Sequence, residues 1–199
     1  MVIICYICIV VIINNIENNM SKAKLKKHLM MLPKERIVNI VLELYDARKE
    51  AKEFLDFYLE PNEDKKLEEY KAIIREEFFP KRRIEPQCRF TVCRKAISDF
   101  KKLKPHPMCI ADLMLYYIEC GVEMTVMYGD MWEQFYTALE NNFDKAMAYI
   151  CQNGYGEPFR ERIERMLHEA EHCGWGFPDT LWDMYYEHMQ SNGYDVDIS

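Results

Sequence analysis

The chain has 199 residues, of which 49% are hydrophobic and 30% are charged, and its formal net charge is −7. This composition is typical of a soluble globular protein, and the length is enough to bury a core without disulfides or metals. An acidic chain argues against a protein whose whole surface is built to bind nucleic acid. The charge is uneven, because residues 81–104 carry +7 and residues 105–199 carry −13.

The N-terminal segment is unlike the rest of the chain. Residues 2–13 are all apolar, but a helix of this length spans about 18 Å, well short of the roughly 30 Å of a membrane core. The segment also lacks the basic start and the small-residue cleavage site of a signal peptide. We expect Met20 to be the natural start, and residues 1–19 to be a non-native or disordered apolar extension. The alternative is a membrane-associating or secretory segment, and a membrane is an expected partner only if residues 2–13 are genuine.

After residue 20, apolar residues recur at spacings of three and four, and proline and glycine mark the ends of the segments. The sequence therefore predicts a single all-α domain over residues 20–190, followed by a frayed acidic tail at 191–199. The expected architecture is an irregular bundle or stacked helical hairpins of about eight helices. The expected helices span residues 21–32, 33–59, 62–79, 86–104, 107–120, 130–152, 158 to about 173, and 178 to about 190.

The helix at residues 107–120 is expected to lie at the centre of the fold. Only Asp112 and Glu119 are charged within it, and every other direction around the helix is apolar. Gly121 is expected to end the helix, with residues 122–128 forming a loop or a short extended piece. Because buried carboxylates must be paired, we expect both acids to pair with lysine or arginine of residues 81–104.

Several short stretches carry a family resemblance. They include Leu25-Lys-Lys-His-Leu, Phe78-Phe-Pro-Lys-Arg, Ala111-Asp-Leu-Met-Leu-Tyr-Tyr and Gly174-Trp-Gly-Phe. These stretches are similar to a bacterial family described as a domain of unknown function, number 6155, and the likeness covers roughly Met20 to Tyr186. The resemblance implies a helical fold, and it brings no activity, cofactor or catalytic residue.

One short motif suggests a metal site. His168 and His172 fit the H-E-x-x-H pattern, in which two histidines on one helical face bind zinc and the intervening Glu169 acts as general base. Glu171 places a second charge inside the motif, and Gly174 ends the helix directly afterwards. We therefore predict no catalytic residue and no cofactor, and we keep a zinc hydrolase as the alternative.

The basic segment at residues 81–104 suggests a second kind of site. Its cations can bind the phosphates of a nucleic acid or another anion, although a run of charge is commonly a solvated helix face. We regard nucleic acid as an unlikely partner for an acidic chain. The anion-binding candidates are Arg82, Arg83, Arg89, Arg94 and Lys95.

Aromatic residues near the C-terminus are a third candidate site. Trp175, Trp182 and Tyr186 would form a partner or ligand pocket if exposed, or would pack the last helix onto the core.

The eight cysteines include several at apolar helical positions, which indicates free thiols and a cytoplasmic location. The function is therefore predicted to be that of a non-catalytic cytoplasmic helical protein. It would act through protein–protein interaction, with an unknown partner or a second copy of itself.

Overall fold

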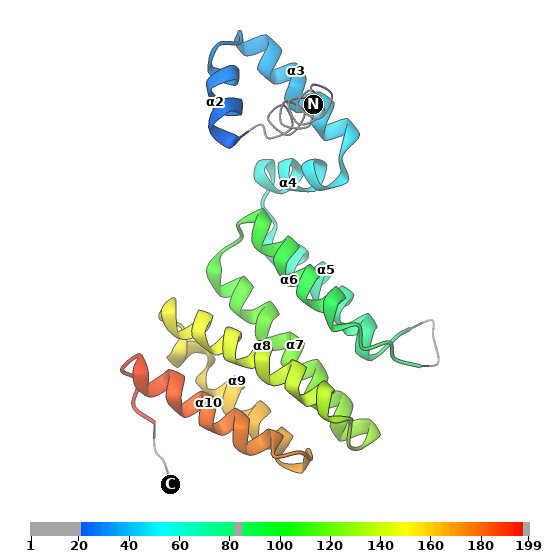
Figure 1. Cartoon of the computed structure of the whole chain (residues 1–199), viewed down its shortest axis with the longest axis vertical. Coiled ribbons are helices and arrows are strands. Elements are labelled where there is room, and N and C mark those ends of the chain that lie inside the picture. Colours follow the sequence, from blue (N-terminus) through cyan, green and yellow to red (C-terminus); the bar gives the residue numbers. More distant parts are fainter. Residues whose placement is uncertain (1–20, 82–84, 197–199) are drawn as a thin grey trace, which may run out of the picture. The chain divides into compact units, whose positions relative to one another are not determined.

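The computed structural model describes residues 21–81 and 85–196, and this part of the chain is all α-helical, as predicted (Figure 1). It divides into two compact units, residues 1–55 and 56–199, with the boundary inside one helix. The expected extension at residues 1–19 lies outside the described residues. The helices are α2 (Lys22–Met30), α3 (Lys34–Ala47), α4 (Lys49–Leu59), α5 (Glu63–Phe78), α6 (Phe90–Leu103), α7 (Pro107–Tyr128), α8 (Glu133–Gln152), α9 (Gly156–Glu169), the 3₁₀ helix η1 (Ala170–His172) and α10 (Phe177–Ser191).

The first unit contains α2, α3 and the start of α4. Ser21 caps α2 as its residue type favours, because its hydroxyl accepts a hydrogen bond from the backbone N–H of Lys24 at 3.3 Å. The single helix expected over residues 33–59 is interrupted at Arg48, where φ is −134° and ψ is 117°. No proline or glycine marks this break. None of the described residues in this unit is fully buried.

The second unit is organised around α7, which contacts α5, α6, α8, α9 and η1 (Figure 1). Twelve of its residues are buried, so the prediction of a central buried helix is confirmed. The expected end at Gly121 is wrong, because α7 continues through this residue to Tyr128.

Gly121 instead allows two helices to approach each other. A Cβ atom at this position would lie 2.6 Å from the Cδ2 atom of Leu139 on α8, which is closer than two carbon atoms can pack. The glycine is therefore explained by the packing of α7 on α8. Its conformational freedom is not used, because its backbone is helical.

Asp112 and Glu119 of α7 are paired with cations of other helices than those predicted. Arg162 on α9 donates to both carboxylate oxygens of Glu119, at 2.6 and 2.7 Å, and its Nη1 lies 3.1 Å from Asp112. Asp112 also lies 3.0 Å from the Nζ of Lys71 on α5. The expectation of partners from residues 81–104 is thus wrong, because the acidic face of α7 is turned towards α5 and α9.

Two helix starts and the C-terminal segment also differ from expectation. The helix expected from residue 86 begins at Phe90, and the helix expected from residue 130 begins at Glu133. Asp130 accepts hydrogen bonds from the Tyr136 hydroxyl and from the Gly174 amide. Residues after α10 fold back, since the Tyr194 hydroxyl accepts a hydrogen bond from the backbone N–H of residue 156. In the described residues, no helix combines the length and the apolar character needed to cross a membrane.

Candidate functional site

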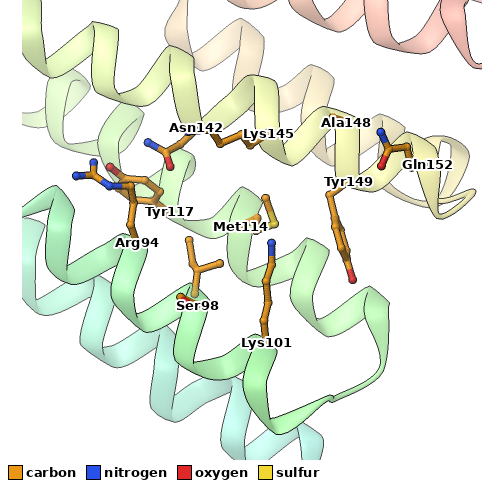
Figure 2. Close-up of a pocket in the computed structure, with 11 residues that line it drawn as sticks. Arg94, Ser98, Lys101, Met114, Tyr117, Asn142, Lys145, Ala148, Tyr149 and Gln152 are labelled. Carbon is orange, nitrogen blue, oxygen red and sulfur yellow. The ribbon is translucent and has the colours of Figure 1, made fainter. Parts of the chain in front are cut away.

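A cavity of about 460 Å³ lies where α6, α7 and α8 of the second unit meet. Figure 2 shows its walls, with α6 on one side, α8 on the other, and α7 behind them. Ile97, Met114, Tyr117 and Asn142 are buried and form its floor, whereas Arg94 and Lys145 are exposed at its rim. The cavity therefore has an apolar base and a charged entrance.

Helical periodicity explains why these side chains share one cavity. The residues that α6 contributes recur at spacings of three and four, which place them on one face of the helix. The residues from α8 follow a similar stripe. The α6 residues are Arg94, Ile97, Ser98 and Lys101, and the main α8 residues are Asn142, Lys145, Tyr149 and Gln152.

Three cations line this cavity without a carboxylate partner. In the described part of the chain, Arg94, Lys101 and Lys145 form no ion pair, whereas Lys95 and Lys102 on the outer side of α6 both pair with an aspartate of the same helix. Lys145 is also the only lysine after residue 104. The cavity is consequently a positive site, formed by two cations of the basic segment at residues 81–104 and one lysine of the acidic residues 105–199.

Lys101 is the most enclosed of the three cations. Its Nζ lies 4.8 Å from the centre of the Tyr149 ring, which is a cation–π distance. Burial lowers the pKa of Lys101, because the charged form loses part of its hydration. A bound anion would compensate this loss.

Tyr117 places an unpartnered hydroxyl at the base of the cavity. Its side chain is fully buried, and its oxygen makes no hydrogen bond within the described residues. Burial raises the pKa of Tyr117, while the neighbouring Arg94 cation opposes the shift. The phenol therefore stays protonated at neutral pH, and its buried O–H group has no acceptor among the described residues.

Three of the five anion-binding candidates from the sequence lie in the described part of the chain, and their environments differ. Only Arg94 lines the cavity. Arg89 holds the buried carboxylate of Glu77 through two side-chain hydrogen bonds, at 2.6 and 2.9 Å. Lys95 pairs with Asp99, and residues 82 and 83 lie outside the described residues.

Sequence reasoning missed Lys101, Lys145 and Tyr117. The spacing of seven between Arg94 and Lys101 was the available signal for the first of these.

The zinc motif is divided between two kinds of helix. His168 lies in the last turn of α9, whereas His172 lies in the 3₁₀ helix η1. The Nδ1 atom of His168 is 2.7 Å from a carboxylate oxygen of Glu171, and its ring packs edge-on against Trp182. Among the described residues, no three histidine, cysteine or acidic side chains are grouped in a way that could hold a metal. Zinc binding by His168 and His172, with Glu169 as base, stays the alternative to the prediction of no cofactor, and a measurement of metal content distinguishes the two.

The three aromatic candidates do not form one pocket. Trp182 and Tyr186 stack with their ring centres 5.5 Å apart on α10, and both are half-buried. Trp175 is 62% exposed in the turn before α10, where its Nε1 donates to the carbonyl of Met131 at 3.0 Å. Its φ of 60° is unusual for a residue other than glycine.

These features define an all-α protein with a cationic cavity, whose three cations form no ion pair with the described residues. The chain belongs to a family of unknown function (DUF6155), whose match covers residues 20–186. No curated protein matches the chain, and no solved structure matches it either.

Proposed function

We propose that this protein is a non-catalytic, cytoplasmic binding protein that takes up a small anion in the cavity between α6, α7 and α8. The observation that carries the proposal is the set of three cations, Arg94, Lys101 and Lys145, which face one cavity and have no carboxylate partner among residues 21–81 and 85–196. Two unit charges 4 Å apart interact with an energy of about 4 kcal/mol under conditions typical of a protein surface. An anion in the cavity would therefore be favoured by several such interactions.

The distribution of charge supports a small anion over a nucleic acid. The net charge is −7, and residues 105–199 alone carry −13. A long polyanion would meet this acidic surface outside the cavity and be repelled by it. A small anion contacts only the cavity.

The six cysteines in the described part of the chain are free thiols, which supports the cytoplasm as the compartment.

The test is a calorimetric titration of the whole chain with phosphate, pyrophosphate, succinate and sebacate at low salt. We expect at least one of these anions to bind, and the variant with both Lys101→Gln and Lys145→Gln to bind it about 10-fold or more weakly, because hydrogen bonds to charged groups are lost. Lys102→Gln is the matched control, because Lys102 neighbours Lys101 but pairs with Asp99. No binding by any of the four anions, or equal binding by all three proteins, would contradict the proposal.

Self-association is a second candidate function, favoured by an exposed apolar stretch. Val126, Met127, Tyr128 and Trp132 are each at least 49% exposed, and Trp175 is hydrogen-bonded to the same segment. Exposed apolar surface of this kind marks interaction sites. We expect sedimentation to show concentration-dependent dimers that Trp175→Gly weakens, since glycine removes the ring and suits the backbone at φ 60°. A monomer at all concentrations would refute this second candidate.

A further inference from the structure

The cations of α6 stand at two separate ends of the cavity. Arg94 and Lys101 are seven residues apart in one helix, so their Cα atoms are separated by about 10 Å along the axis. Figure 2 shows the Arg94 side chain beside Tyr117 at one end and Lys101 closer to Tyr149. The cavity is therefore an elongated site with a cation at each end.

The floor between the two ends is mainly apolar, although Ser98 and Asn142 also line the cavity. Ile97 lies between Arg94 and Lys101 on the inner face of α6 and is 8% exposed, and Met114 of α7 is 7% exposed. The isoleucine side chain has no hydrogen-bonding group, and the methionine sulfur is only a weak acceptor. The middle of a bound ligand should accordingly be hydrocarbon.

The Arg94 end has a second donor in the Tyr117 hydroxyl. This oxygen is buried and has no hydrogen-bond partner within the described residues, and leaving a buried polar group unpaired is costly. A carboxylate has two acceptor oxygens and can accept from a guanidinium and a phenol together. One cation at each end also matches the single charge of a carboxylate better than the higher charge of a phosphate.

We infer that the ligand is an elongated dicarboxylate with a hydrocarbon middle. One carboxylate accepts hydrogen bonds from Arg94 and Tyr117, the other pairs with Lys101, and the hydrocarbon lies over Ile97 and Met114. Lys145 stands on the opposite wall, between the two ends of the α8 stripe, and adds positive potential to the whole site. This inference rests on the proposed function, because it names the class of anion that the same cavity takes up.

The first experiment uses linear dicarboxylates of increasing length as a ruler. The probes are succinate, adipate, suberate, sebacate and dodecanedioate, with decanoate as the single-charge control and phosphate as the control without hydrocarbon. We expect the affinity of the whole chain to pass through a maximum near suberate or sebacate. That best dicarboxylate should bind about 10-fold or more tightly than decanoate, because it adds a second charged contact.

Variants then test the two ends separately. Lys101→Gln should reduce the affinity for the best dicarboxylate to that for decanoate. Tyr117→Phe should weaken binding about 10-fold, yet raise the melting temperature of the free protein by about 2–4 °C, because an unpaired buried hydroxyl is removed. Tyr116→Phe is the matched control, since Tyr116 neighbours Tyr117 but lies against Lys71 of α5. Arg94→Gln, with Lys95→Gln as control, tests the same end should Tyr117→Phe fold poorly.

The outcomes separate this inference from the proposed function. Equal binding of sebacate and decanoate, tighter binding of phosphate or succinate, or no effect of Lys101→Gln on chain-length preference would overturn the dicarboxylate inference. Each of those results leaves an anion-binding cavity in place, provided the double lysine variant still weakens binding. Absence of binding by every probe would overturn both.

Discussion

Replacing Arg162 by methionine tests the charge network that holds α9 against the central helix. Methionine keeps most of the apolar length of the side chain but cannot pair with Glu119 or Asp112, which Arg162 contacts at 2.6 to 3.1 Å. Asp112 keeps Lys71 as a partner, so Glu119 is the carboxylate left uncompensated. We expect the free energy of unfolding to fall by about 2–3 kcal/mol.

This magnitude follows from the partial burial of the network. Removing one partner of a fully buried ion pair costs about 3–5 kcal/mol, whereas exposed pairs contribute about 0–1 kcal/mol. The three side chains are 25% to 27% exposed, which places the loss between these limits and nearer to the buried case. For a chain of this size, the melting temperature should fall by about 5–10 °C.

The assay is thermal and urea unfolding followed by circular dichroism. Arg165→Met is the matched control, because Arg165 lies one turn further along α9, is exposed, and forms no ion pair within the described residues. Its melting temperature should stay within about 1 °C of the original chain. A loss below about 0.5 kcal/mol for Arg162→Met relative to this control would refute the view that the network stabilises the packing of α7 and α9.

Three further predictions concern packing, acid and metal. Gly121→Ala should destabilise the fold by about 1–3 kcal/mol through overpacking against α8, and an unchanged urea midpoint would contradict the close approach. Arg75 lowers the pKa of Glu123 through a paired hydrogen bond. The stabilisation of the folded protein by this ion pair is therefore complete above pH 4.5, the ordinary pKa of a glutamate. It is lost as the pH falls through the lower pKa that Glu123 has in the folded protein. Acid unfolding curves should show that the original chain loses this stabilisation and that Glu123→Gln does not. Parallel curves for the two proteins would contradict the prediction. Finally, elemental analysis of chelator-free protein should find no stoichiometric zinc, since η1 breaks the helical register of the motif; one zinc per chain that disappears in His168→Ala would establish a metal site.

The helices themselves were largely predictable, because each has a regular apolar stripe. Proline and glycine located most ends correctly, as at Pro107, where α7 begins. Gly121 shows the limit of that reasoning. A glycine at an apparent helix end and a glycine at a helix crossing are identical in sequence, and only the position of Leu139 on another helix distinguishes them. The break at Arg48 carries no local signal at all.

The cavity was less predictable, because it depends on which faces of three helices meet. The basic segment did point to Arg94, but it also pointed to Arg89 and Lys95, whose charges are used within the protein. Lys145 is a lone lysine in an acidic stretch, and nothing in the sequence places it in the same cavity as Arg94. Tyr117 reads as an ordinary core residue, and its unpartnered hydroxyl is visible only once its surroundings are known.

The pairing of Glu119 with Arg162 also constrains the order in which this protein can mature on the ribosome. The arginine lies 43 residues after the glutamate, so the central helix is synthesised long before its main counter-charge. Until α9 has left the ribosome, Glu119 lacks its arginine partner, although Lys71 and Arg75 of α5 can already pair with Asp112 and Glu123, and the packing of α7 on α9 cannot form. Shortened chains that end before Arg162 should consequently be poor substitutes for the whole protein, however complete their remaining helices are.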